Sequence, residues 1–310
     1  MLLKEIIQAF ELIDNPQASG AKVTAAFDQN RGVKVELETL EGDRGSTDLI
    51  KLSVAGLDGK LNGGKAPTLG LIGQLGGVGA RPDQIGAVSD ADGAIVAIAC
   101  ALKLASMVNK GELLTGDVII TTHICPNSPT IPHDPVPFMG SPVELKPLMD
   151  SSVDPEMDAI LSVDATKGNE IINLNGFAIS STVKEGYILR VSGDLLRMMK
   201  IVLSRPPVTF PISMQDITPY GNGLYHINSI LQPATVTNSP VVGVAPTSGQ
   251  VIPGVATGAN YPLELESTAR FCLEVAKEFG RGSCRFYDEE EFERIVDLYG
   301  PMNILQTLGR

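Results

Sequence analysis

The sequence predicts an α/β protein, a three-layer sandwich in which helices cover both faces of a central, mostly parallel mixed sheet. Strand-like and helix-like segments alternate between residues 66 and 124, as in sheets with helical crossovers. A second such cycle begins near residue 141. The 310 residues are 43% hydrophobic, and no repeat or long polar linker interrupts them. We therefore expect a single domain spanning residues 1–310.

The N-terminal part predicts a helix followed by a hairpin. Residues 1–14 carry apolar side chains at helical spacing, and two glutamates among them exclude the uninterrupted apolar stretch of a signal peptide. Residues 32–40 and 47–56 are rich in β-branched side chains, and the turn-forming residues 41–46 separate them. We expect these two segments to be antiparallel strands at an edge of the sheet.

The next residues predict the first strand, helix and strand of the parallel sheet. Residues 67–73 are typical of a buried strand, and a glycine-rich turn follows at 74–82. A long apolar helix is expected from about residue 92 to 109, and a strand at 116–124. Because the helix is charged at Lys103 and its most apolar part is too short to cross a bilayer, it predicts a buried core helix.

The remaining residues predict further strands and helices. The expected helices lie at 141–151, 194–204, 223–231, 263–280 and 288–300. The expected strands are a buried strand at 157–166, a polar hairpin within 170–192, and strands at 208–217 and 239–247.

Composition excludes several classes of partner. The chain has 36 acidic and 24 basic residues, a formal net charge of -12, and no basic cluster that could neutralise phosphates. Aromatic residues make up 5%, and tryptophan is absent. We expect no nucleic-acid and no membrane partner, but a small-molecule or peptide ligand. The four cysteines form no C-x-x-C pair, so we expect reduced thiols and a cytoplasmic location.

Four polar residues are expected at one edge of the sheet. Gln74, Asp90, His123 and Asp164 each lie at or just beyond the carboxyl end of an expected strand. Open α/β sheets bind their ligands at this edge. The sequence therefore predicts that these side chains meet in one cleft.

Two short patterns have ordinary explanations. The glycine-rich residues 67–84 lack the G-x-x-x-x-G-K-[ST] pattern, and Pro82 follows the glycines, so a close-packed turn is favoured over a nucleotide site. Asp90 and Asp92 lack the further ligands of a calcium loop. One of them is enough to cap the helix, which leaves Asp90 free to face a cleft.

Several segments together resemble the zinc-dependent exopeptidases, a superfamily that includes bacterial aminopeptidases and acetylornithine deacetylase-like amidohydrolases. Asp90-Ala91-Asp92-Gly93 opens an apolar helix and is similar to the motif of the aspartate that bridges two metal ions in that superfamily. The strand at 157–166 is similar to the strand with a further aspartate ligand, and residues 223–280 to the closing segment. The resemblance spans about residues 66–280. It implies the hydrolase-like sandwich of these exopeptidases, in a prokaryotic branch.

The chain departs from that superfamily at its metal ligands. Gln74-Leu75-Gly76 stands where the resemblance places His-x-Asp, and His123-Ile124 stands near the Glu-Glu pair. Asn260-Tyr261 stands near the final ligand histidine. The resemblance therefore implies that the usual two-zinc site is incomplete, although Asp90 and Asp164 match metal ligands.

We expect a remodelled site with one divalent metal, either Zn, Mn or Fe, because imidazole and carboxylate suit these ions. The expected metal ligands are Asp90, His123, Asp164 and His226. Gln74, Asn260 and Tyr261 are expected to bind substrate. Asp92 or His133 is the candidate general base. The resulting hypothesis is a hydrolase-like protein that cleaves an amide bond in a small peptide or N-acyl amino acid.

Other hypotheses stay open at this point. Asp164 and His226 are equally well explained as ordinary structural residues with hydrogen-bond partners. A metal-free enzyme could use Cys125 as nucleophile and His123 as base, because residues two apart on a strand share a face. A third hypothesis is a non-catalytic small-molecule-binding relative. The proline-rich residues 126–142 predict either a lid or a contact in a homo-oligomer.

Overall fold

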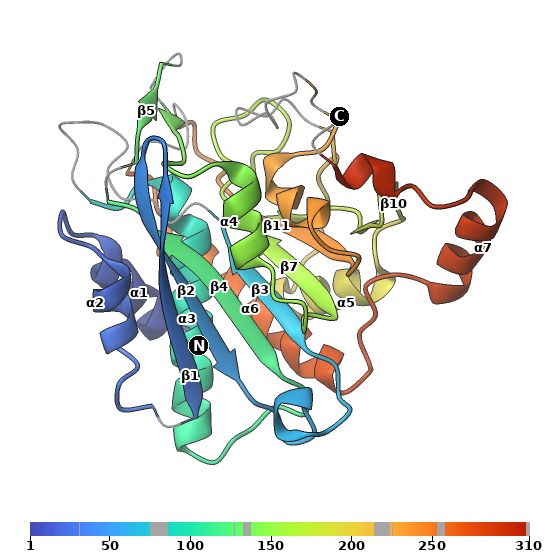
Figure 1. Cartoon of the computed structure of the whole chain (residues 1–310), viewed down its shortest axis with the longest axis horizontal. Helices are drawn as coiled ribbons and strands as arrows, with labels where there is room; N and C mark the ends of the chain where they lie inside the picture. The colour runs from blue at the N-terminus through green and yellow to red at the C-terminus, as the bar shows by residue number, and fades with distance from the viewer. Residues whose placement is uncertain are drawn as a thin grey trace.

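The computed structural model describes residues 1–30, 32–74, 86–126, 128–132, 138–213, 224, 226–252 and 258–307. Within them, nine strands form one mixed sheet with the order β1-β2-β4-β3-β7-β11-β9-β10, and β8 also pairs with β11 (Figure 1). These strands are β1 (Val33–Gly42), β2 (Gly45–Val54), β3 (Leu69–Gly73), β4 (Val118–Ile124), β7 (Ala159–Val163), β8 (Gly176–Ile179), β9 (Val183–Lys184), β10 (Tyr187–Ile188) and β11 (Val241–Thr247). A separate pair joins β5 (Thr130–Ile131) and β6 (Phe138–Met139).

Helices cover both faces of the sheet. The α-helices are α1 (Leu3–Ile13), α2 (Gly20–Ala25), α3 (Asp92–Asn109), α4 (Leu145–Ser152), α5 (Gly193–Leu203), α6 (Pro262–Gly280) and α7 (Glu289–Tyr299). Short 3₁₀ helices are η1 (Lys60–Asn62), η2 (Ser89–Ala91), η3 (Ser229–Thr235) and η4 (Asn303–Gln306). The predicted fold class, helices on a central mixed sheet, is confirmed.

The centre of the sheet is parallel. β3 pairs in parallel with β4 and with β7, and β7 pairs in parallel with β11. All residues of these four strands are buried, which explains why their sequences are mostly apolar and do not alternate between apolar and polar residues. The antiparallel strands flank this centre, so the carboxyl ends of the four parallel strands meet at one edge.

The predicted edge hairpin is confirmed. β1 and β2 pair antiparallel from Val33 opposite Val54 to Gly42 opposite Gly45, and β1 is the outermost strand. The turn between β1 and β2 therefore contains two residues and is tighter than the six-residue turn that the sequence predicts. Gly45 has a φ of 133°, a backbone conformation that glycine adopts without strain.

The first helical layer consists of α1, α3, α5 and α6. Their buried side chains form one large core with β2, β3, β4 and β7, and α3 lies at its centre. The residues 89–109 are apolar and long enough to cross a membrane, but 78% of an apolar 18-residue window within them is buried inside the protein. This burial agrees with the prediction of a core helix.

The opposite face of the sheet carries α4 and η3. Apolar residues of η3, including Ile230 and Leu231, pack with Ile160 of β7 and Val241 of β11 in a second core. Figure 1 shows α4 in front of the sheet, with α3 and α6 behind it. The structure thus has the three layers that the sequence predicts.

Three expected segments differ from the structure. Residues 170–192 do not form one hairpin, because β8 pairs with β11 and only β9 and β10 pair with each other. In 208–217, the described residues form one isolated bridge at Thr209, since Pro211 has no N–H for a ladder. The helix expected at 223–231 is the 3₁₀ helix η3, which begins at Ser229.

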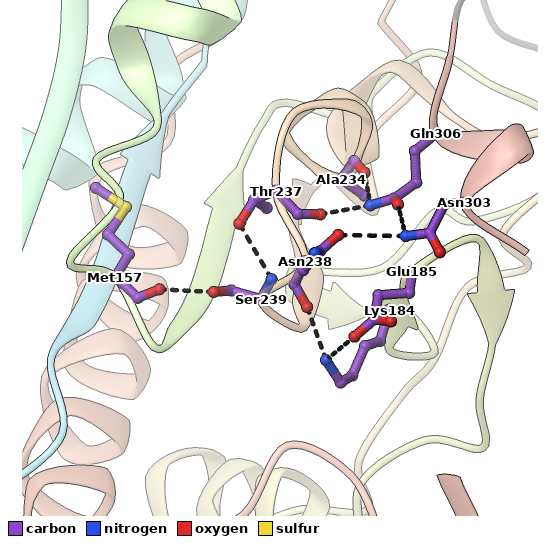
Figure 2. Close-up of polar contacts among 9 residues, drawn as sticks. All are labelled: Met157, Lys184, Glu185, Ala234, Thr237, Asn238, Ser239, Asn303 and Gln306. Atoms are coloured by element: carbon purple, nitrogen blue, oxygen red, sulfur yellow. Dashed lines mark hydrogen bonds and ion pairs between the residues drawn. The ribbon is translucent and has the colours of Figure 1, made fainter. Parts of the chain in front are cut away.

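The C-terminal residues first extend away from the rest of the structure and then contact it again. Helix α7 has no buried residue and projects away from the sheet (Figure 1). The following η4 returns to the connection before β11, where Gln306 donates from Nε2 to the carbonyl oxygen of Ala234 over 3.1 Å (Figure 2). Asn303 donates from Nδ2 to Oδ1 of Asn238 over 3.3 Å (Figure 2). Hydrogen bonds from these side-chain amides therefore hold η4 against the residues before β11.

Candidate functional site

The start of helix α3 is packed against the carboxyl ends of β3 and β7. A Cβ added to Gly93 would lie 2.4 Å from the carbonyl oxygen of Val163 and 2.5 Å from that of Gln74. Side chains do not approach backbone oxygens so closely, so glycine is required here. This close packing places the residues just before Gly93 at the edge where open sheets bind ligands.

Two aspartates and one lysine gather at this edge. Nζ of Lys167, a residue that follows β7, forms an ion pair with Oδ2 of Asp92. Asn260 donates from Nδ2 to Oδ1 of Asp92 over 2.6 Å. Asp90 is 3% exposed and lies close enough to Asp92 and Lys167 to interact with both charges. We call Asp90, Asp92, Lys167 and Asn260 the carboxylate–ammonium cluster.

Burial controls the protonation of the aspartates in this cluster. Removal from water and, to a smaller extent, the nearby Asp92 carboxylate raise the pKa of Asp90 to about 8, against the opposing charge of Lys167. Burial also raises the pKa of Asp92, against the opposing charge of Lys167 and the hydrogen bond from Asn260. Asp90 therefore retains its proton at pH 7, which lowers the charge buried at this edge.

The Lys167 ammonium has further partners beside Asp92. It donates to the carbonyl oxygen of Ala259 over 2.7 Å and lies 5.2 Å from the centre of the Tyr261 ring. The Tyr261 hydroxyl donates to Oε1 of Gln250 over 2.9 Å. The side chains of Asn260 and Tyr261, expected to bind substrate, thus hold the cluster together from the start of α6.

A second set of polar residues lies side by side across the sheet. The register pairs Thr122 of β4 with Gly73 of β3, and Gly73 with Val163 of β7. The residues that follow are His123, Gln74 and Asp164, which we call the sheet-edge row. Each of the three is 5% exposed. Neighbouring strands lie about 4.8 Å apart, so the backbones at these three positions lie side by side.

Gln74 of this row is held by strand β7. Its backbone N–H donates to the carbonyl oxygen of Val163 over 2.8 Å, and Nε2 donates to Oγ of Ser162 over 3.1 Å. Gln74 stands where the resemblance places a metal-ligating histidine. Its amide donor is directed to a neighbouring hydroxyl.

The hydrogen bonds around His123 determine which ring nitrogen carries the proton. Nδ1 lies 2.9 Å from Oγ1 of Thr47, and Thr47 donates its hydroxyl hydrogen to the carbonyl oxygen of Ile124 over 3.2 Å. Thr47 must therefore accept from Nδ1–H, which leaves a lone pair on Nε2. Nε2 has no hydrogen-bond partner among the described residues, and burial lowers the His123 pKa to about 4. The imidazole is neutral at pH 7.

The residues of the expected cysteine site have other contacts. Cys125 is fully buried, and its thiol donates to the carbonyl oxygen of Ser46 over 3.6 Å. All four cysteines are free thiols. The hypothesis of a Cys125 nucleophile stays a prediction.

The four expected metal ligands lie in different surroundings. Asp90 lies in the carboxylate–ammonium cluster, His123 and Asp164 lie in the sheet-edge row, and His226 is exposed before η3. Over the residues that the structure describes, no three His, Cys, Asp or Glu side chains are grouped so that they could hold a metal ion. His133, a candidate general base, lies outside the described residues.

Asp92 has no oxygen free for a metal ion. It lies two positions after Asp90, the residue that matches the bridging aspartate of the resemblance, and an ammonium and an amide already bind its two oxygens. Since no three His, Cys, Asp or Glu side chains among the described residues are grouped to hold a metal, these residues do not fit the two-metal centre of the zinc-dependent exopeptidases.

Sequence reasoning missed Lys167 and Thr47. Lys167 lies three residues after Asp164, and a lysine just beyond a buried strand is ordinarily a solvated loop residue. Thr47 begins an amphipathic strand, where a threonine is common. The one sequence signal for a functional role of Lys167 was its position, because it follows the carboxyl end of a parallel strand.

Comparison with solved structures shows an aminopeptidase-like fold. A glutaminyl cyclase from an Acidobacteriales bacterium matches with a TM-score of 0.53 and 11% identity, covering 91% of this chain and 94% of the cyclase. The cytosol aminopeptidase of Coxiella burnetii matches with a TM-score of 0.51 and 15% identity, covering 91% of this chain and 69% of that protein. Likeness at this identity shows the fold alone.

Sequence comparison shows the family. No curated protein matches the chain. One family model matches residues 38–309, which include the second half of β1 and every later element to η4. The chain therefore belongs to the family described as "Protein of unknown function (DUF1177)".

Proposed function

We propose that this protein is a hydrolase that cleaves an amide bond in a small peptide or N-acyl amino acid. The observation that carries the proposal is the gathering of Asp90, Asp92 and Lys167 at the carboxyl edge of the parallel strands. This edge is the usual ligand site of open α/β sheets. The aminopeptidase-like fold of the two structural neighbours supports the proposal.

The cluster contains the groups that amide hydrolysis requires. Negative charge develops on the carbonyl oxygen during attack by water, and an ammonium at that oxygen stabilises it. The leaving amine needs a proton, which a carboxyl group that is protonated at neutral pH can donate. In this proposal Lys167 stabilises the oxyanion, and Asp90 donates its proton to the leaving amine and takes up the proton that the attacking water loses. Asp92 holds the Lys167 ammonium in position.

Amine release from a panel of substrates tests this proposal. The purified protein is incubated with dipeptides, aminoacyl anilides and N-acetyl amino acids, and the free amine is quantified. We expect turnover of one class, and a loss of at least about 100-fold in kcat/KM on Asp90→Asn, the size of effect typical of a proton donor. Asp150→Asn, the same change at an exposed ion pair with Lys146, is the control and should retain activity.

A second candidate is a non-catalytic small-molecule-binding protein of the same fold. The complete burial of the Asp92 and Lys167 side chains favours it, because these charges already satisfy each other inside the protein. Under this alternative no substrate in the panel turns over, while one of the same compounds raises the melting temperature. Turnover that depends on Asp90 would exclude it.

The divalent metal, the cytoplasmic location and the homo-oligomer stay predictions. Four free, buried cysteines agree with a reducing compartment. No step of the proposed hydrolysis uses a metal.

A further inference from the structure

Both carboxylate oxygens of Asp92 are occupied by side chains of the protein itself. Oδ2 forms the ion pair with Lys167, and Oδ1 accepts the 2.6 Å hydrogen bond from Asn260. Neither Asp92 nor Lys167 has any side-chain exposure. Water therefore does not compete for this ion pair, and the attraction between the two charges is stronger than at the surface.

A metal ion and the Lys167 ammonium cannot share Oδ2 of Asp92. A carboxylate oxygen binds a zinc or manganese ion at about 2.0–2.2 Å, well inside the contact distance of an ammonium on the same oxygen. Two cations at that separation repel strongly in a buried site. A metal on this oxygen therefore requires the Lys167 ammonium to leave.

Other contacts keep the ammonium in its position. The carbonyl oxygen of Ala259 accepts its hydrogen bond of 2.7 Å, and the ring of Tyr261 lies 5.2 Å away. A carboxylate, a carbonyl and an aromatic ring each stabilise a buried cation. The ring and the carbonyl belong to the residues before α6, so three distant parts of the chain surround one ammonium.

The charges in direct contact also match one monovalent cation. The Asp92 carboxylate and the Lys167 ammonium form an ion pair between side chains without any exposure, so the two charges offset each other. A divalent ion added to this pair would leave excess positive charge in a site without exposed side chains, which is unfavourable.

We propose that Lys167 is the resident cation of this site. Its ammonium occupies the cation position on Asp92, two residues after the Asp90 that the resemblance to zinc-dependent exopeptidases assigns to a metal, and the protein binds no divalent metal at Asp92. Removal of the ammonium converts Asp90, Asp92 and the neighbouring oxygens into a site for a divalent ion. This inference concerns the same residues as the proposed function, but it holds whether or not the protein hydrolyses an amide.

Metal content of the wild-type protein is the first test. The full chain is incubated with MnCl₂ or ZnCl₂, desalted, and analysed by mass spectrometry for metal per chain. We expect no stoichiometric metal at Asp92. One metal per chain that disappears in Asp92→Asn overturns the proposal. Metal that persists in Asp92→Asn lies elsewhere and agrees with it.

Mn²⁺ binding to Lys167→Met is the second test. We expect this variant to bind Mn²⁺ at least tenfold more tightly than the wild type in calorimetric titration, because an oxygen-lined site has lost its cation. Lys60→Met removes an exposed lysine that pairs with Asp158, and this control should not gain affinity. Equal Mn²⁺ affinity in Lys167→Met and the wild type overturns the proposal.

Folding of the variant provides a third readout. If Lys167→Met is insoluble when produced alone, production with MnCl₂ in the medium should restore folded protein, since Mn²⁺ replaces the lost charge. Failure of Mn²⁺ to restore it counts against the proposal. These measurements do not use turnover, so they fail or succeed separately from the proposed hydrolase activity.

Discussion

Asn260 and Asp92 are 168 positions apart in the chain, yet Nδ2 of Asn260 donates to Oδ1 of Asp92 over 2.6 Å. The same amide donates to the carbonyl oxygen of Val88 over 2.9 Å. Asn260 immediately precedes the N-cap of α6, and Asp92 is the first residue of α3. One side chain therefore links the starts of the two central helices of the core.

The variant Asn260→Ala should destabilise the protein. It removes two hydrogen bonds and leaves a buried carboxylate oxygen with one donor fewer, so we expect the free energy of unfolding to fall by about 2–3 kcal/mol. Urea denaturation followed by circular dichroism measures this. Asn173→Ala, which removes one exposed hydrogen bond to Asn169, is the control, and an equal effect of the two would contradict the role of Asn260.

The variant Gly93→Ala should be more damaging than an ordinary glycine substitution in a helix. The new methyl group would lie within 2.5 Å of two backbone oxygens, so α3 must move away from the strands. We expect a loss of about 3 kcal/mol or more in unfolding free energy. Gly193→Ala at the start of α5 is the matched control, because no atom lies within 4 Å of its added Cβ. Comparable stability of the two variants would show that α3 is not tightly packed.

The raised pKa of Asp90 predicts a loss of stability with rising pH. In the folded protein this carboxyl titrates near pH 8, whereas its ordinary value is 3.8. Between these values the folded state binds more protons than the unfolded state, so the unfolding free energy falls as pH rises. Near pH 6.5 we expect a contribution of about -1.4 kcal/mol per pH unit, which shrinks to about half of this at pH 8 as the folded carboxyl loses its proton. Urea denaturation at intervals from pH 6.5 to 8 measures it, and a wild-type slope no steeper than that of Asp90→Asn would contradict it.

His123 has the opposite effect at lower pH. Burial lowers its pKa from 6.5 to about 4, so the unfolded state binds more protons between these values. Its contribution to stability is complete above pH 6.5 and is lost as pH falls toward 4. We expect the His123→Gln variant to lack this loss of unfolding free energy between pH 6.5 and pH 4.5. The control variant Asn173→Ala leaves the imidazole in place and should show the same loss of unfolding free energy as the wild type. An unchanged difference between the two pH values in His123→Gln would show that the imidazole is not buried in neutral form.

Much of the fold could be predicted because its signals are local. Continuous apolar runs predict β3, β4 and β7, since strands buried on both faces need no alternation. Helical spacing of apolar residues predicts α1 and α6 close to their observed bounds. Where the local signal was weak the prediction was wrong, as at residues 170–192, because pairing of β8 with β11 depends on a strand more than 60 positions away.

The sequence by itself determined which strands are buried and that Gln74, His123 and Asp164 lie at or just beyond the carboxyl ends of three of them. Only the tertiary structure decided that His123 turns its Nδ1 to Thr47, and that Lys167 pairs with Asp92. The reason is that strand ends are set by local hydrogen bonding and hydrophobic pattern. The partner of a charged side chain is set by burial, which exists only once α3, β7 and the start of α6 have packed together.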